Sequence, residues 1–328
     1  MSVTYLQAIK DVISEEMRRD EKIFIMGEDV EVLGGVFGVT KGLVDEFGAK
    51  RVRNTPISEA GIVSCGLGAA CAGMRPIVEL MYMDFALVAA DSLINQVAKT
   101  RYIFGGKAKV PLVIRGQQGV GRGNAATHSQ SLEAIFMHFP GIKVAMPATP
   151  DDARGLLRTA IRDDNPVMFF EHKALYNVKG EVNNDPEYMI PFGKAKVARQ
   201  GEDVTIVATH MYVHKALKVA DRLEKEGISA EVIDPRTLVP FDWDTLVKSV
   251  TKTGRAVVVH EAHRTCGVGA EIAAELTERV FRYLDAPIMR LGAKACPLPF
   301  NLGLENAVIP QEKDIYSACI KLMYKERN

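Results

Sequence analysis

The stretch Thr55-Pro56-Ile57-Ser58-Glu59-Ala60-Gly61 decides the fold of the first half of the chain, because it leads directly into an apolar helix. Its proline favours an extended residue before it, and Ser58 is of a residue type that often caps a helix N-terminus. Gly73 is a common helix terminator. The sequence therefore predicts a helix from about Glu59 to Ala72, with the Glu59 carboxyl group at its start.

The predicted helix is built mainly from small residues. Gly61, Cys65, Ala69 and Gly73 recur at four-residue spacing, which allows another helix or another subunit to pack closely against it. A segment of this length is too short to cross a bilayer, which needs roughly 20 apolar residues. Taken alone, Glu59 is explained by a favourable interaction with the helix dipole, and a functional role depends on its neighbours.

Composition indicates an ordinary globular protein. A chain of 328 residues exceeds the usual size of a single hydrophobic core, so two domains are expected. Lys and Arg number 41, as do Asp and Glu, and the resulting net charge of +0 predicts neither nucleic acid nor a membrane as a partner. The cysteines lack C-x-x-C spacing, and the predicted N-terminal helix is amphipathic and contains acids, unlike a signal or transit peptide. These features predict reduced thiols and a cytoplasmic protein.

Helical and strand periods alternate along both halves of the chain. In the first half, helices are expected at residues 4–19, 40–47, 59–72, 84–100, from about 127, and 150–162, and strands at 22–26, 76–81, 110–115, 143–146 and 166–171. In the second half, the expected helices are 212–225, 243–251 and 268–283, and the expected strands are 203–208, 229–233, 256–260 and 287–291. Residues 173–200 lack a strong period and form the expected linker. The pattern predicts an α/β fold with two doubly wound domains, each with a mostly parallel sheet.

Three motifs suggest other chemistries, and each departs from its template. The glycine-rich loop 116–123 follows a strand but lacks G-x-G-x-x-G spacing, so nicotinamide binding is disfavoured. His210 and His214 have no evident third metal ligand, and surface histidines explain them better than zinc does. The segment His260-Glu261-Ala262-His263 has its histidines three apart at a strand end, which indicates polar residues at a sheet edge rather than an H-E-x-x-H site.

His128 lies in Thr127-His128-Ser129-Gln130, a segment with the pattern of a helix capping box. In the first turn of a helix the dipole disfavours imidazolium, so a neutral histidine that exchanges protons is expected. A capping-region histidine without a role is the alternative for this residue alone. However, four residues follow predicted strand ends of one sheet, at the edge where open parallel sheets bind ligands. They are Glu28, Glu59, Phe85 and His128.

Longer motifs carry a family resemblance. They are GEDV (27–30), RVRNTPISEAGI (51–62), MRPIVELMYMDF (74–85), THSQSLEA (127–134), GIKVAMPATPDDARGLL (141–157), IRDDNPVMFFEHK (161–173) and DPRTLVPFD (234–242). In this order they resemble the beta subunit of the thiamine-diphosphate-dependent first component of 2-oxo acid dehydrogenase complexes, nearly end to end. Members of that family act on pyruvate, branched-chain 2-oxo acids or acetoin.

The resemblance implies a transketolase-like α2β2 assembly. Residues 1–185 would form the domain that binds the pyrimidine ring of thiamine diphosphate, and residues 186–328 the transketolase C-terminal domain. Glu59 would hydrogen-bond and protonate the pyrimidine, a role that suits a carboxyl group in an apolar pocket. Phe85 would stack on the ring, and the pocket would be lined by Ile57 and Met81. Glu28 would be a second acid near the ring, and His128 would face the substrate or the incoming lipoyl group.

The resemblance also implies metals and partners. Backbone carbonyl groups would hold a structural potassium ion, from Leu112, Ala160, Asp163 and Asn165. The G-D-G signature for diphosphate and magnesium does not occur in this sequence, so both are expected in the alpha subunit. The partners would be this alpha subunit, with which the cofactor is shared, and a lipoyl-bearing acyltransferase core.

The sequence does not decide which of the family's substrates this chain uses. The segment EHK at 171–173 favours acetoin or pyruvate over branched-chain 2-oxo acids, and some relatives carry a polar residue at the position of Val88. Three alternatives to an acetoin or pyruvate beta subunit remain at this point. They are a branched-chain beta subunit, a non-catalytic structural subunit, and a stand-alone oxidoreductase that binds a nucleotide through loop 116–123.

Overall fold

A computed structural model describes residues 2–323 of the chain. The chain forms two compact units. The first unit runs to Gln118 and resumes from Ile135 to Phe192, whereas the second contains Gly119–Ala134 and the described residues from Gly193 onward. The domain boundary at 185 and 186 stays a prediction, and the inclusion of 119–134 in the second unit was not expected.

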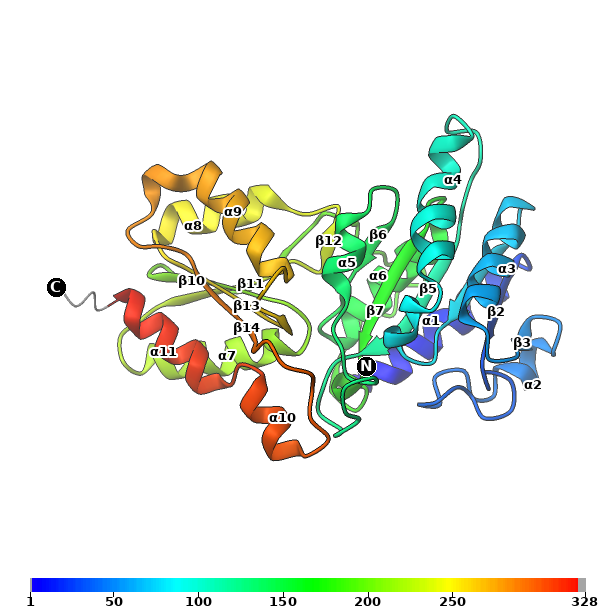
Figure 1. Ribbon diagram of the computed structural model, residues 1–328, viewed down its shortest axis with the longest axis horizontal. Coiled ribbons are helices and arrows are strands. Elements are labelled where there is room, and N and C mark those ends of the chain that lie inside the picture. Colours follow the sequence, from blue (N-terminus) through cyan, green and yellow to red (C-terminus); the bar gives the residue numbers. More distant parts are fainter. Residues whose placement is uncertain (1, 324–328) are drawn as a thin grey trace. The chain divides into compact units, whose positions relative to one another are not determined.

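The first unit is built around a parallel sheet in the order β6-β7-β5-β4-β2-β3, with helices on both faces (Figure 1). Its strands are β1 (Ser2–Thr4), β2 (Ile23–Gly27), β3 (Val52–Asn54), β4 (Arg75–Glu79), β5 (Val113–Gln118), β6 (Lys143–Ala145), β7 (Val167–His172) and β8 (Lys179–Glu181). Its α-helices are α1 (Tyr5–Arg19), α2 (Leu43–Phe47), α3 (Glu59–Cys71), α4 (Ala98–Ile103), α5 (Glu133–His138) and α6 (Pro150–Arg162), and β1 pairs with β8 in a separate antiparallel ribbon. The predicted α/β class is confirmed.

Two helices of the first unit begin where local sequence signals place their N-termini. The Thr4 hydroxyl accepts a hydrogen bond from the backbone N–H of Gln7 at 3.1 Å and caps α1. Thr149 caps α6 in the same way, and Pro150 occupies the first turn, where its missing N–H costs nothing. The predictions for residues 4–19 and 150–162 are therefore confirmed to within one residue.

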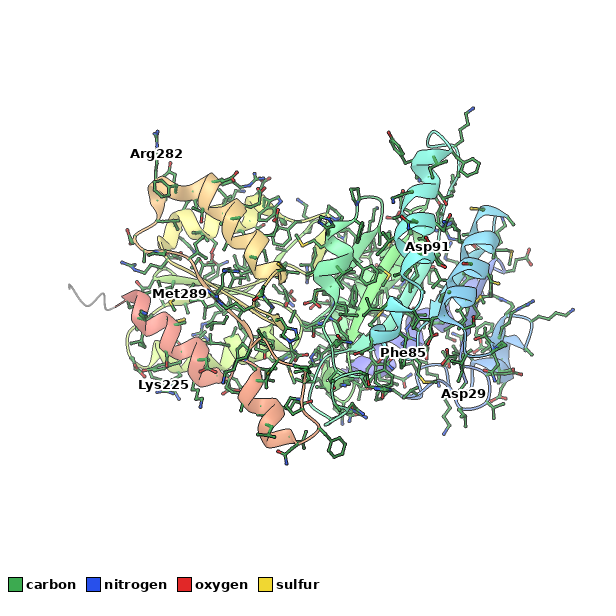
Figure 2. The ribbon with its side chains drawn as sticks, in the orientation of Figure 1. Asp29, Phe85, Asp91, Lys225, Arg282 and Met289 are labelled. Carbon is green, nitrogen blue, oxygen red and sulfur yellow. The ribbon has the colours of Figure 1, made fainter. Side chains whose placement is uncertain are left out.

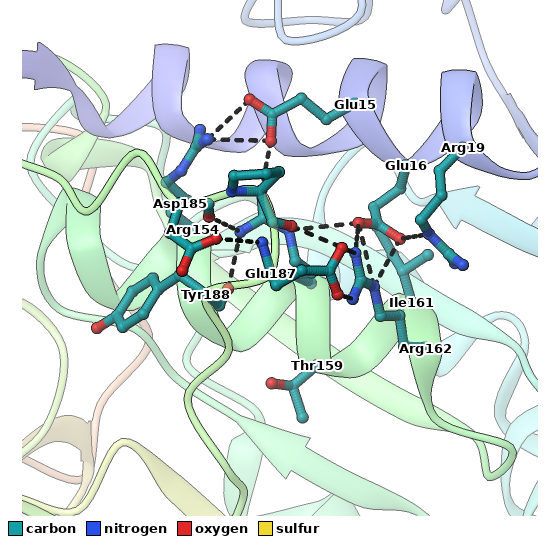
Figure 3. Close-up of polar contacts among 12 residues, drawn as sticks. Glu15, Glu16, Arg19, Arg154, Thr159, Ile161, Arg162, Asp185, Glu187 and Tyr188 are labelled. Atoms are coloured by element: carbon teal, nitrogen blue, oxygen red, sulfur yellow. Dashed lines mark hydrogen bonds and ion pairs between the residues drawn. The ribbon is translucent and has the colours of Figure 1, made fainter.

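An ion-pair cluster joins α1 to α6, as Figure 3 shows. Arg154, Arg158 and Arg162 recur at four-residue spacing along α6 and form one face of the helix. They meet two adjacent acids of α1: Arg154 and Arg158 bond Glu15, and Arg162 bonds Glu16 at 2.8 Å. The same arginines donate to carbonyl groups in the chain after β8, which fixes that segment against both helices.

The segment predicted as one helix at 84–100 is divided into three pieces. A 3-10 helix spans Met83–Leu87, a π-helical turn spans Ser92–Val97, and α4 follows directly. The Ser92 hydroxyl bonds Ser64 Oγ at 2.9 Å and the Ala60 carbonyl at 3.3 Å, both on α3. These contacts hold the turn against α3, and local helical period alone does not encode them.

The second unit contains a sheet in the order β14-β13-β10-β11-β9, parallel except for the edge strand β9. Its strands are β9 (Lys196–Arg199), β10 (Val204–Ala208), β11 (Ala230–Asp234), β12 (Thr237–Val239), β13 (Ala256–His263) and β14 (Met289–Ala293). Its helices are α7 (Met211–Glu224), α8 (Trp243–Thr253), α9 (Val268–Val280), α10 (Leu302–Val308) and α11 (Glu312–Met323). The last two helices were not predicted. Among the described residues of the chain, no helix has both the length and the apolar character needed to span a bilayer.

His260 lies inside this sheet, and its assignment to a polar sheet edge was wrong. β13 has neighbours on both sides, and the His260 side chain is buried. A Cβ at Gly269 or Gly292 would lie 2.8 Å from the imidazole, so these glycines provide the space for it. Burial lowers the pKa of His260 to about 4, and the ring is therefore neutral at physiological pH.

Candidate active site

The residues predicted to form the site in the first unit follow the carboxyl ends of β2, β3 and β4. Glu28 follows β2 directly, Glu59 opens α3, and Phe85, labelled in Figure 2, follows β4. Glu28 and Glu59 are each only 6% exposed. Burial raises the pKa of the Glu28 carboxyl group, and the Glu59 and Asp29 carboxylates raise it further. The structure thus brings the two predicted acids close enough to interact.

Two buried polar atoms in this part of the first unit, one of them on Glu28 itself, are unsatisfied. Glu28 Oε1 and Thr55 Oγ1 are buried and have no hydrogen-bond partner among the described residues. Buried polar atoms in native proteins are nearly always hydrogen-bonded, so such a pair marks a place for a polar ligand. A ring that bears nitrogen atoms and an amino group supplies both donors and acceptors.

Glu28→Gln is expected to change how stability depends on pH. Because folding raises the pKa of Glu28, the folded chain holds this proton more tightly than the unfolded chain, where Glu titrates near about 4.3. The wild-type chain therefore becomes less stable as the pH rises through the folded-state pKa of Glu28. The stability advantage of Glu28→Gln should grow between about pH 4.5 and pH 7.5, as measured from urea midpoints. An advantage that shrinks over this range would contradict the assignment.

The predicted pocket residues differ in burial. Phe85 is half-buried, with its ring centroid 6.3 Å from that of Tyr82 in an edge-to-face arrangement. Met81 is also half-buried, and its carbonyl group accepts a hydrogen bond from the Gln117 amide. Ile57 is 81% exposed, so this chain alone does not enclose it. The roles of these residues in a pocket stay predictions.

An ionic cluster that sequence analysis missed is buried in the same sheet. Arg115 on β5 lies between Glu79 on β4 and Glu171 on β7, and the three side chains are at most 6% exposed. Arg115 Nε and Nη2 donate to the two oxygens of Glu171 at 2.6 and 2.7 Å, and Nη1 bonds Glu79. Burial raises the pKa of Glu79, and Arg115 offsets part of that rise. The available signal was a charged residue inside each of three apolar strands.

The cluster is connected to the backbone of the site. Tyr176 Oη donates to Glu171 Oε2 at 2.6 Å and lies 3.4 Å from Gln117 Oε1. The side-chain amide nitrogen of Gln117 donates the hydrogen bond to the Met81 carbonyl. Gly35, at a φ of +73°, lies so close that a Cβ would collide with Glu79 Oε1. The ionic cluster therefore supports both Met81 and the glycine loop after β2.

His128 is not placed as the sequence predicted. The helix expected from residue 127 begins at Glu133, so the capping box is wrong and His128 lies in a loop. Its Nδ1 is 2.9 Å from the Thr127 hydroxyl, and its side chain is half-buried. The loop belongs to the second unit, whereas Glu59 belongs to the first. Their juxtaposition stays a prediction.

Three of the four carbonyl groups predicted to hold potassium accept hydrogen bonds. Arg75 Nη2 donates to the Asp163 carbonyl at 2.7 Å, and the Val167 amide donates to the Leu112 carbonyl at 2.9 Å. The Ala160 carbonyl accepts from the Asp163 amide at 3.3 Å. Each carbonyl oxygen has a second lone pair, so these bonds leave an acceptor available for a cation.

Known families match both units. Residues 1–179 match the family described as Transketolase, pyrimidine binding domain, and residues 193–315 match Transketolase, C-terminal domain. The chain is 47% identical over 324 residues to the pyruvate dehydrogenase E1 component subunit beta of Rickettsia felis, with 99% of each chain covered. The chain belongs to the E1 beta-subunit family.

Two further relatives in the E1 beta-subunit family differ in their named activities. The chain is 46% identical over 333 residues to the beta subunit of acetoin:2,6-dichlorophenolindophenol oxidoreductase from Bacillus subtilis, with 98% of this chain and 97% of the relative covered. It is 46% identical over 309 residues to the 2-oxoisovalerate dehydrogenase subunit beta of the same organism, with 93% and 94% covered. Near-equal identities to the three relatives do not select one substrate.

The small-residue helix α3 of this E1 beta-family chain has two different faces. Its buried face packs on the chain's own sheet, where a Cβ at Gly66 would lie 2.7 Å from Val78 and 3.1 Å from Leu112. The opposite face is exposed and includes Gly61 and Gly68. Close packing thus accounts for Gly66 within the chain, and it leaves the exposed small residues for a separate explanation.

Proposed function

We propose that this chain is the beta subunit of a thiamine-diphosphate-dependent dehydrogenase of the acetoin or pyruvate type. With its alpha subunit it would cleave acetoin or decarboxylate pyruvate and then reductively acylate the lipoyl group of the complex core. The observation that carries the proposal is the buried pair of acids, Glu28 and Glu59, at the carboxyl edge of the parallel sheet. The alternatives are a branched-chain 2-oxo acid substrate and a non-catalytic structural subunit.

The residues of the first unit fit the aminopyrimidine ring of thiamine diphosphate. Glu59 would hold a proton at a ring nitrogen, and Phe85 would stack on the ring face. The unsatisfied Glu28 Oε1 and Thr55 Oγ1 match a ligand that carries ring nitrogens and an amino group. Ile57 and Met81 would line the pocket. Bound thiamine diphosphate would supply the nucleophilic carbon of its thiazolium ring, while these residues orient the ring and control one proton.

The proposed assembly is an α2β2 heterotetramer. The chain has no G-D-G signature, so the alpha subunit would hold the magnesium and the diphosphate. Ile57 and Val88 are 81% and 61% exposed, and they lie in the same unit as the exposed small-residue face of α3. An exposed apolar and small-residue surface suits burial against another subunit. The lipoyl-bearing acyltransferase core would be the second partner, and the complex would be cytoplasmic.

Two further roles complete the proposal. His128 would face the substrate or the lipoyl group. A potassium ion would bind the second lone pairs of four backbone carbonyl groups, from Leu112, Ala160, Asp163 and Asn165. Oxygen ligands in a ring of carbonyl groups are suited to a hard monovalent cation.

Equilibrium dialysis tests the proposed function. We expect thiamine diphosphate with magnesium to bind only when the alpha subunit is added, because each subunit would supply part of the site. Turnover of the assembled enzyme with acetoin, pyruvate and a branched-chain 2-oxo acid then identifies the substrate. Cofactor binding without turnover on any of them would favour the structural subunit, and tight binding of a nicotinamide nucleotide by this chain alone would contradict the proposal.

A further inference from the structure

The loop that carries His128 lies in the sequence between two elements of the first unit, but it packs with the second unit. Residues 119–132 connect β5 to α5, and together with the first two residues of α5 they cluster with the second unit. Val120 is buried among residues from the C-terminal part of the chain, namely Ala293, Leu298, Val308 and Ile309. The backbone at Gly123 approaches the Phe300 carbonyl so closely that a Cβ would lie 2.7 Å from it.

Two buried carboxylates of the second unit bond this loop. Glu261 Oε1 accepts a hydrogen bond from the Val120 amide at 2.8 Å and one from the Ser131 hydroxyl at 3.2 Å. Glu305 Oε2 accepts one from the Gly121 amide at 3.0 Å. Glu261 and Glu305 are 7% and 1% exposed. The bonded groups lie on both sides of His128 in the sequence, so the carboxylates restrain the segment at both ends.

Such carboxylates are an expensive way to stabilise a fold. Glu305 Oε1 is buried and has no hydrogen-bond partner among residues 2–323, whereas Glu305 Oε2 accepts the hydrogen bond from the loop amide of Gly121. An apolar side chain of similar size would fill the same volume without the desolvation penalty of a charge. A carboxylate instead fixes a backbone N–H in one direction, because charge-assisted hydrogen bonds are short and directional. This chemistry suits the control of loop conformation.

We propose that Glu261 and Glu305 are positioning residues that hold the His128 loop in one conformation. The C-terminal domain would thereby contribute to acyl transfer without touching the reacting atoms. The catalytic consequence rests on the proposed function, in which His128 faces the substrate or the lipoyl group. The restraint on the loop does not rest on it, and the two are tested separately.

Limited trypsin digestion of the full chain tests the restraint. Arg122 is exposed within the loop, and Lys107 is exposed in the first unit. In Glu261→Ala and Glu305→Ala, cleavage after Arg122 should become about tenfold faster while cleavage after Lys107 is unchanged, because only the loop gains freedom to open. Glu278→Ala removes an exposed carboxylate of α9 and serves as the matched control. Unchanged cleavage after Arg122 would overturn the proposal.

The conservative variants address misfolding. Glu261→Gln and Glu305→Gln keep an oxygen that accepts the loop N–H, so they should restore most of the protection at Arg122. If an alanine variant accelerates cleavage after Lys107 as much as cleavage after Arg122, relative to the wild type, the variant has unfolded. The glutamine variants then decide the question. They should still show cleavage after Arg122 that is about twofold to threefold faster than in the wild type, with Lys107 unaffected. Glutamine variants identical to the wild type at Arg122 would overturn the role of the charge.

A double-mutant comparison tests the catalytic consequence in the enzyme assembled with its alpha subunit and lipoyl-bearing core. Glu261→Ala should slow reductive acylation of the lipoyl group by about tenfold, with thiamine diphosphate affinity kept within about twofold. In a His128→Ala background, Glu261→Ala should cause no additional loss, because it acts through the same loop. Additive losses would overturn the positioning role. If His128→Ala alone has no effect, the proposed role of His128 fails, whereas the digestion result still decides whether the carboxylates restrain the loop.

Discussion

Glu59→Gln is expected to reduce turnover of the assembled enzyme by about 10²- to 10⁴-fold, the usual contribution of a general acid or base. The amide has nearly the shape of the carboxyl group, so it keeps the packing at the start of α3, where Glu59 is 6% exposed. It cannot give up or accept the proton that the pyrimidine ring requires. The measurement is steady-state turnover with the alpha subunit present, together with sedimentation to show that the subunits still assemble.

Glu21→Gln is the matched control for this variant. Glu21 is an exposed acid of the same unit, so its substitution changes the net charge by the same amount without altering the buried pair. We expect its turnover to match the wild type. Full activity in Glu59→Gln would remove this residue from the mechanism, and loss of assembly would show that Glu59 supports the fold instead.

The parts of the fold that sequence reasoning predicted well depend on local chemistry. α1 and α6 begin at threonine caps, and their boundaries follow from side-chain-to-backbone bonds only a few residues long. The acids Glu28 and Glu59 could be anticipated as neighbours because both follow ends of parallel strands. The rise that the Glu59 carboxylate causes in the pKa of Glu28 agrees with that expectation.

The features that sequence reasoning missed depend on contacts between distant residues. The capping box predicted at Thr127 lies instead in a loop whose flanking residues bond Glu261 and Glu305, which lie far along the chain. No local period encodes such a restraint, and tertiary contacts routinely override local helix signals. The Arg115 cluster was missed for a related reason, since the pairing partners of a charged residue in a strand depend on strand order. That order places β5 between β4 and β7 only after folding.

Arg115→Met is expected to cost about 3–5 kcal/mol of the free energy of unfolding, the usual penalty for breaking a buried ion pair. Methionine fills much of the volume but leaves Glu79 and Glu171 buried without their cation. The loss should be smaller at acidic pH, because burial raises the pKa of Glu79 and protonation of this acid removes part of the uncompensated charge. Urea unfolding followed by circular dichroism measures the loss. The chain's one tryptophan, Trp243, lies in the second unit, so its fluorescence reports on that unit separately.

Two other arginine variants give this experiment its comparison. Arg282→Met removes an exposed guanidinium, labelled in Figure 2, and should change stability by less than about 0.5 kcal/mol. Arg115→Lys keeps the charge but loses the fork that bonds both oxygens of Glu171, so its loss should lie between those of the two methionine variants. A loss for Arg115→Met no larger than that for Arg282→Met, or one that grows as the pH falls, would show that the buried carboxylates do not depend on Arg115. In that case Met81 and the Gly35 loop would have to be supported by other contacts than this cluster.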